Sequence, residues 1–219
     1  MTLKKTIEND IGRMRELFPK LLLISREGAP PCFQGEIDIC DVKGVYWDTF
    51  NIKILAPVNY PFGVPLINEI GLRIERIADR HISNNGYCCV AVNHVLLHHA
   101  ANRLTIADFT EQYIYPYFAN QLYFDQNGRF ADQEYLHGFQ GIQQFYKETL
   151  NSKNLQTSIK LLEYVLEKKS PPRNSHCFCE GGKKFKNCHL FALEYLGKVD
   201  VLQLNSDLDE FERLLRHSI

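Results

Sequence analysis

The chain begins with apolar side chains at helical spacing. They recur every three or four residues, which places them on one face of a helix. The residues are Ile7, Ile11, Met14 and Phe18. Pro19 follows, and proline does not continue a helix because it has no amide hydrogen to donate. The pattern therefore predicts an amphipathic helix at about residues 4–18.

A period of two replaces the helical spacing further along the chain. In residues 33–40 the apolar side chains fall on one face, and residues 45–55 repeat this alternation. Shorter apolar runs at 21–25 and 66–70 complete a set of about four strands. Alternating strands joined by short turns favour an antiparallel sheet with helices packed on it, so we predict an α+β fold.

The second half of the chain is predicted to be mainly helical. Thr105 and Asp108 have the spacing of a capping box before an aromatic-rich helix at about 107–124. Pro116 lies inside this helix and predicts a kink or a break. Three further helices are expected at about residues 142–149, 155–168 and 207–216.

Composition and charge narrow the class of protein. Of the 219 residues, 45% are hydrophobic and 23% are charged, as is typical of a globular protein, and the formal net charge of −1 gives no general attraction to nucleic acid or acidic membranes. No apolar run approaches the ~18 residues of a membrane helix, and the N-terminus lacks a secretory signal. The seven cysteines do not have the spacing of a disulfide scaffold, so we expect a cytoplasmic protein.

Two adjacent cysteines follow a polar loop in the middle of the chain. Successive side chains of an extended strand point to opposite faces, so Cys88 and Cys89 must differ in environment. Cys88 shares its face with Val90 and Val92, which predicts that it is buried. Cys89 then faces the polar side and is a candidate nucleophile. The alternative interpretation is that both are ordinary buried thiols.

The residues around this pair resemble the core of a ubiquitin-conjugating enzyme. The resemblance rests on Tyr60-Pro61, Pro65, His81 and the run Gly86-Tyr87-Cys88-Cys89-Val90. In that family the last cysteine of this pattern carries a ubiquitin-like protein as a thioester, a role that maps to Cys89. The resemblance implies the family's α+β fold over about residues 1–150, with an N-terminal helix, an antiparallel meander of about four strands and C-terminal helices.

The chain departs from the family beside the expected nucleophile. The family has His-Pro-Asn, whereas His81 is followed here by Ile82 and Ser83, so the family's asparagine is displaced. Exchange at a thioester passes through a tetrahedral oxyanion, which needs a hydrogen-bond donor nearby. The candidates for this catalytic role are His81, Asn84, Asn85 and His94. For His94, the alternative is an ordinary position in an exposed or interfacial loop.

The resemblance implies a thioester transferase. Cys89 would accept an activated C-terminal acyl group, hold it as a thioester and pass it to an amine. The chain has no Gly-rich nucleotide loop, so a separate activating (adenylating) enzyme must supply the acyl donor. The cargo would be a ubiquitin-like modifier or, by analogy with bacterial anti-phage defence, a cyclic-nucleotide-making nucleotidyltransferase. The competing hypothesis is an inactive scaffold or binding module, which the displaced asparagine favours.

A second candidate site follows the helix-breaking run Ser170-Pro171-Pro172. Three thiols and one imidazole lie within a short segment, and Gly181 and Gly182 permit the chain reversal that brings them together. These ligands are of the kind that structural zinc prefers, namely Cys177, Cys179, Cys188 and His189. The segment resembles the zinc knuckle (SEC-C motif) at the C-terminus of the bacterial secretion motor protein. We expect a helical extension over residues 151–219 that carries a zinc knuckle at about 175–190; the alternative is reduced thiols without metal.

Overall fold

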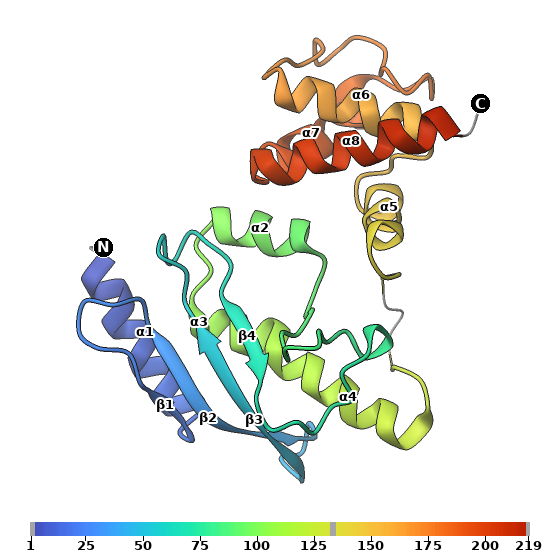
Figure 1. Ribbon diagram of the computed structural model, residues 1–219. Helices are drawn as coiled ribbons and strands as arrows, with labels where there is room; N and C mark the ends of the chain where they lie inside the picture. Colours follow the sequence, from blue (N-terminus) through green and yellow to red (C-terminus); the bar gives the residue numbers. More distant parts are fainter. Residues whose placement is uncertain (1–2, 132–134, 218–219) are drawn as a thin grey trace. The chain divides into compact units, whose positions relative to one another are not determined.

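The computed structural model describes residues 3–131 and 135–217 (Figure 1). The chain divides into two compact units. Unit 1 comprises Met1–Ala91 and His99–Glu134, and unit 2 comprises Val92–His98 and Tyr135–Ile219. Unit 1 combines a sheet with helices, while the described part of unit 2 is helical. The predicted mixed α+β class is therefore confirmed.

Unit 1 is built on a four-stranded antiparallel meander. Its strands β1 (Leu21–Leu23), β2 (Cys32–Cys40), β3 (Tyr46–Leu55) and β4 (Leu66–Glu69) lie in the order in which they follow along the chain. Each strand pairs antiparallel with the next. The alternation seen in the sequence puts one set of apolar side chains in the core. The fully buried members are Phe33, Ile37, Ile39, Phe50, Ile52 and Ile54.

Helices pack against this sheet. Helix α1 (Leu3–Leu17) corresponds to the first predicted helix and contacts both β1 and the short helix α3 (Ile106–Phe109). Helix α4 (Tyr115–Asn127) crosses the sheet in Figure 1 and contacts β2. The Phe118 ring of α4 lies 4.5 Å from the Phe50 ring of β3, measured between centroids. The aromatic side chains of the predicted helix thus cover the apolar face of the sheet.

The helix around Pro116 is interrupted as predicted, but upstream of the proline. Thr105 caps α3, since its hydroxyl accepts a hydrogen bond from Asp108 N–H at 3.1 Å. A π-helical turn, Thr110–Ile114, then joins α3 to α4, and Pro116 sits in the first turn of α4. The wider turn accommodates a residue without an amide hydrogen while the helical path continues.

A buried carboxylate joins α1 to the start of α3. Asp10 is 3% exposed. Its oxygens accept hydrogen bonds from the backbone N–H groups of Ile106 (2.9 Å) and Ala107 (3.0 Å), and from the hydroxyl of Tyr60. Burial, together with the adjacent Asp10 carboxylate, raises the pKa of Tyr60, so its hydroxyl remains protonated and able to donate. Three segments that are distant in the sequence therefore meet at one side chain.

Unit 2 is a cluster of helices. It contains α5 (Phe139–Glu148), α6 (Leu155–Leu166), α7 (Leu190–Leu196), α8 (Val201–His217) and the first part of α2 (Asn93–Ala101). The helices predicted here are present, although α8 begins earlier than expected. Core residues of this unit include Phe145, Tyr146, Leu161, Leu162, Leu204 and Phe211. Because α5 supplies two aromatic side chains to this core, the compact unit begins before the boundary near residue 150 that the sequence indicated.

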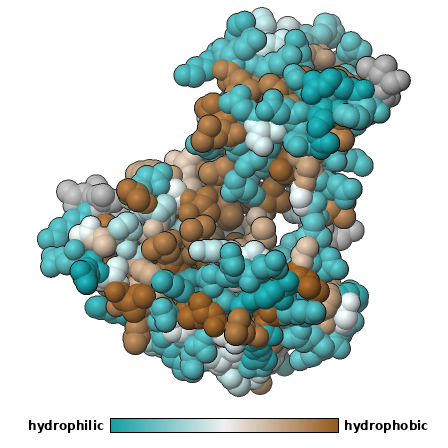
Figure 2. All heavy atoms as spheres, viewed as in Figure 1, coloured by the Kyte–Doolittle hydropathy of each residue, from teal (hydrophilic) through white to brown (hydrophobic). Residues whose placement is uncertain are grey.

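The surface mixes polar and apolar groups. On the face in Figure 2, hydrophilic residues cover much of the surface of each unit, and hydrophobic residues are scattered among them. Exposed apolar side chains include Trp47 at 47%, Leu72 at 80% and Leu202 at 80%. Within the described ranges, no helix combines the length and apolar character needed to cross a bilayer.

The Asp10 contacts predict a large loss of stability on truncation. Asp10→Ala leaves two backbone N–H groups and a buried hydroxyl without their acceptor, so the free energy of unfolding should fall by at least about 3 kcal/mol. Urea unfolding followed by the fluorescence of Trp47, the only tryptophan in the chain, reports on unit 1. Glu8→Ala, at an exposed position of the same helix, should change the value by less than about 0.5 kcal/mol. Equal losses in the two variants would contradict the assigned role of Asp10.

Candidate functional site

The segment with the adjacent cysteines is held to β4 by backbone hydrogen bonds. Glu69 N–H donates to the Gly86 carbonyl at 2.8 Å, and Cys88 N–H donates to the Ile67 carbonyl at 3.0 Å. Gly86 has φ +83°, and a Cβ atom at this position would lie 2.5 Å from the Glu69 carbonyl oxygen. Glycine is therefore needed both for the left-handed backbone and for the close approach to β4.

The two thiols differ in exposure, but Cys88 is partly exposed rather than buried as the sequence predicted. Cys89 is exposed and Cys88 is only partly so. Burial raises the pKa of the Cys88 thiol to about 12, which keeps it protonated at neutral pH. Since the thiolate is the nucleophilic form of cysteine, Cys88 is a poor nucleophile. Cys89 is therefore the thiol of this pair that a reactant can reach.

His81 lies beside Cys89 in the backbone ladder. Cys89 N–H donates to the His81 carbonyl at 2.8 Å, and Ile82 pairs with Cys88 in an antiparallel bridge. His81 has a left-handed backbone with φ 50°, which is uncommon for a residue other than glycine. Burial lowers the pKa of its half-buried imidazole, so the ring is neutral at pH 7 and able to accept a proton.

The two loop asparagines lie at the surface. Asn84 and Asn85 are both exposed, at a turn closed by Gly86 N–H donating to the Ser83 carbonyl at 2.8 Å. The Asn68 side chain of β4 donates to the Asn85 carbonyl at 2.9 Å and so holds this turn. The backbone of the loop is thus fixed, while the amide groups of both asparagines are exposed to an approaching molecule.

The structure places His94 in the core of unit 2. Its ring is 0% exposed, and its Nε2 lies 2.5 Å from the Asp207 carboxylate. The same carboxylate accepts hydrogen bonds from the Tyr146 hydroxyl at 2.9 Å and from the Gln203 side chain at 2.8 Å. The ring also stacks on Phe145, with 5.0 Å between centroids. These contacts give His94 a structural role within unit 2, in place of the exposed or interfacial loop position offered as the alternative.

A buried polar network holds Arg80, the residue before His81. The sequence pattern did not predict this network. The Arg80 carbonyl accepts hydrogen bonds from the Tyr117 hydroxyl and from the Gln121 amide, both at 3.0 Å. The Arg80 guanidinium donates to Gln121 Oε1 at 2.7 Å and to Asp125 at 2.6 Å. Polar residues of an amphipathic helix are normally expected in solvent, which is why α4 gave no sign that Gln121 is buried.

The Cys/His cluster predicted as a zinc knuckle comes together in space. The ligand atoms of Cys177, Cys179, Cys188 and His189 all lie within 4.8 Å of one another, so the cluster can hold a metal ion. His189 Nδ1 lies 3.2 Å from the sulfur atoms of both Cys177 and Cys188, and the Cys179 and Cys188 sulfurs are 3.5 Å apart. A tetrahedral zinc ion separates sulfur and nitrogen ligands by roughly 3.5–3.8 Å, close to this arrangement.

The second ring nitrogen of His189, Nε2, also has a hydrogen-bond partner. Nε2 lies 3.1 Å from the Asn151 carbonyl, which can only accept, so this nitrogen carries the hydrogen. Nδ1 then has its lone pair toward the three sulfurs, as a metal ligand requires. Burial lowers the pKa of His189 and keeps the imidazole neutral. The ring is therefore oriented and protonated for ligation through Nδ1.

Comparison with known proteins found no match to this chain. No family model matches it, and neither a curated protein nor a solved structure does. What the chain does chemically is therefore inferred from the positions of its own thiols, imidazoles and amides.

Proposed function

We propose that this chain is a ubiquitin-conjugating-like acyl transferase that carries its cargo as a thioester on Cys89. The observation that carries the proposal is the contrast between an exposed Cys89 and a neighbouring thiol whose pKa burial raises to about 12. The order of elements supports it, since a helix, a four-stranded meander, the cysteine segment and further helices follow one another as in that family.

In the first step the Cys89 thiolate attacks the carbonyl carbon of an activated C-terminal acyl group. A new carbon–sulfur bond forms, the tetrahedral intermediate collapses, and the donor's thiolate or adenylate leaves with its electron pair. Exchange between two thioesters is nearly balanced in energy, so placement of the thiol matters more than driving force. The backbone bonds of Gly86 and Cys88 to β4 fix that placement.

In the second step an amine attacks the thioester carbon, and the Cys89 thiolate leaves as an amide forms. The amine loses a proton, for which the neutral imidazole of His81 is the candidate acceptor. The exposed amide groups of Asn84 and Asn85 are the candidate donors to the oxyanion. The partners are an adenylating enzyme and either a ubiquitin-like modifier or a cyclic-nucleotide-making nucleotidyltransferase.

A binding module is the competing function. The position of His94 in the core of unit 2 favours it, because it reduces the set of candidate oxyanion donors to the exposed loop beside Cys89. In that case the same surface would present a ubiquitin-like protein without forming a covalent bond. The presence or absence of a thiol-sensitive adduct separates the two functions.

For the Cys/His cluster we propose one structural zinc ion. Four protein ligands would fill a tetrahedral site and leave no position for water or substrate, which distinguishes structural from catalytic zinc. The hydrogen bond from His189 to the Asn151 carbonyl supplies the outer contact that such ligands normally make.

Substitution of the adjacent cysteines tests the thioester. The chain is incubated with ATP, an adenylating enzyme and a ubiquitin-like modifier, then separated on a non-reducing gel. Cys89→Ala should abolish the adduct, and Cys89→Ser should trap an oxyester that resists thiols. Cys88→Ala should retain the adduct and cost about 1 kcal/mol of stability. An adduct that survives in Cys89→Ala and vanishes in Cys88→Ala would place the nucleophile one residue earlier, whereas no adduct in any variant would support the binding module.

Thiol labelling gives a pH-dependent check that needs no partner. Because the pKa of Cys88 is raised to about 12, its thiolate fraction should rise about tenfold for each pH unit between roughly pH 7 and 11. Peptide mapping after brief iodoacetamide treatment should find Cys89 modified at least about tenfold faster than Cys88 at neutral pH. Similar rates at the two positions would contradict the assigned difference in environment.

Removal of the metal should affect unit 2 selectively. Elemental analysis of the purified chain should find one zinc ion, and a chelator should increase hydrogen exchange in residues 175–196, because metal binding contributes directly to folding. Trp47 fluorescence should remain native. Cys179→Ser should lose the zinc, whereas Lys183→Gln, at an exposed position in the same segment, should keep it. A chain without zinc, or a knuckle unaffected by chelation, would refute the proposal.

A further inference from the structure

Unit 2 contains a cavity whose lining includes neither Cys89 nor any of the four Cys/His ligands. Its volume is about 440 Å³, and it is bounded by the C-terminal end of α6, by α7 and by the start of α8. Most of its lining is apolar, including Val165, Leu166, Leu193, Val199, Val201 and Leu204. A mostly apolar cavity with a few polar groups, within a range of about 300–1,000 Å³, is typical of a small-molecule site.

The polar part of the lining is positively charged. Lys168, Lys169 and Ser170 contribute to it, and no acidic residue lines the cavity. Lys169 is already paired, with its ammonium 2.7 Å from the Glu167 carboxylate. Among the described residues, Lys168 has no ion-pair partner. The cavity therefore combines apolar walls with the exposed side chain of Lys168, which has no ion-pair partner among the described residues.

Lys168 is held in an unusual backbone conformation. It has φ 53°, and its N–H donates to the Val165 carbonyl at 3.1 Å, while Lys169 N–H donates to the Tyr164 carbonyl at 2.9 Å. This pair of bonds is the Schellman arrangement that ends many helices, and its left-handed position is usually occupied by glycine. A lysine at this position strains the backbone, and it places a long charged side chain where a glycine would have none.

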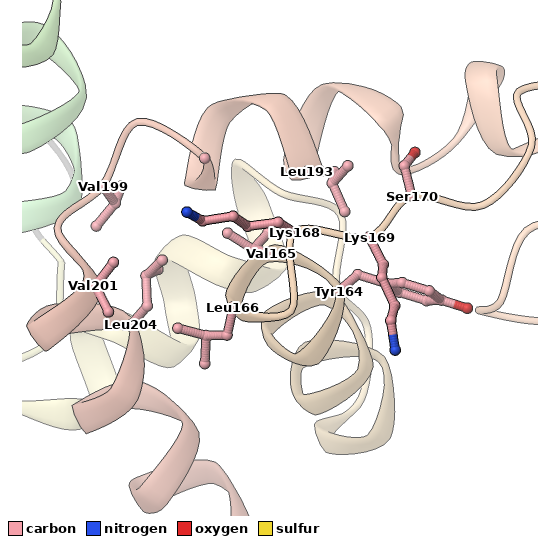
Figure 3. Close-up of a pocket in the computed structure, with 11 residues that line it drawn as sticks. Tyr164, Val165, Leu166, Lys168, Lys169, Ser170, Leu193, Val199, Val201 and Leu204 are labelled. Atoms are coloured by element: carbon pink, nitrogen blue, oxygen red, sulfur yellow. The ribbon is translucent and has the colours of Figure 1, made fainter.

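The direction of the side chains agrees with this difference between the two lysines. In Figure 3, Lys168 extends from the end of α6 across Val165 toward Val199, while Lys169 points away from it. Asp200 is the acidic residue just before α8. Its carboxylate caps that helix, because it accepts a hydrogen bond from Leu202 N–H at 2.7 Å. The charge of Lys168 thus lies along one wall of the apolar cavity.

From these features we infer that the cavity binds a small amphiphilic carboxylate, with an alkyl chain against the apolar walls and its carboxylate on Lys168. The charge complementarity selects an anion, and the walls select a hydrocarbon. The occupant is a soluble medium-chain fatty acid. The lining of this site does not include Cys89, so its test does not depend on the proposed transfer activity.

Calorimetric titration of the intact, metal-loaded chain with decanoate tests the inference. Decanoate should bind, and each added methylene from octanoate to decanoate should strengthen binding about fourfold. Lys168→Asn retains a residue that tolerates the left-handed conformation but removes the charge, and it should weaken decanoate binding about tenfold. Binding of neutral decanol should change less than about twofold. Lys169→Asn, the matched control for charge, should leave the affinity for decanoate nearly unchanged.

A second pair of variants tests the apolar walls. Val201 lines the cavity and is 58% exposed, while its neighbour Leu202 is 80% exposed and is not part of the lining. Val201→Ser should weaken binding of decanoate and decanol alike by several-fold, and Leu202→Ser should not. The inference is overturned if decanoate does not bind, if Lys168→Asn and Lys169→Asn behave alike, or if acidic, leucine-rich peptides bind at this cavity and decanoate does not.

Discussion

The carboxylate of Asp10 is the interaction on which unit 1 depends most. A charged group withdrawn from water is tolerated only when its hydrogen bonds are satisfied, and Asp10 obtains its donors from segments 50 and 96 residues away. One of them is Tyr60, next to Pro61, whose carbonyl accepts a hydrogen bond from Leu104 N–H at 2.8 Å. The turn leading into β4 and the start of α3 are thereby fixed together. Since β4 holds the cysteine segment, the position of Cys89 follows from the same set of contacts.

The features that could be predicted from the sequence are those whose causes are local. The strand faces of β2 and β3 follow from alternation, the cap at Thr105 from a three-residue spacing, and the Cys/His cluster from ligands within a short segment. Asp10 and Gln121 could not be predicted, because each is a polar side chain on the buried face of its helix, and its hydrogen-bond partners lie far along the chain. The longer extent of α8 and the π-helical turn before Pro116 likewise depend on packing.

His189 and His94 differ in how far along the chain their partners lie. His189 finds its sulfur neighbours within 12 residues, so its role could be inferred from spacing. His94 finds Asp207 at a separation of 113 residues, and no local pattern indicates that contact. This buried contact joins α2 to α8 within unit 2. The cavity could not be predicted from a local pattern either, because its walls come from residues of three helices and the connections between them.

The division of α2 has a consequence for how the chain can be cut. Residues Val92–His98 belong to unit 2 although they lie within the sequence of unit 1, so the two units are interleaved. A chain ended near residue 134 would keep these residues without the core that buries Val95 and Leu97, and a chain begun there would lack them. Neither fragment is a complete folding unit. A single cut in the chain therefore cannot separate the two cores cleanly, because the first part of α2 packs with residues that lie beyond residue 134.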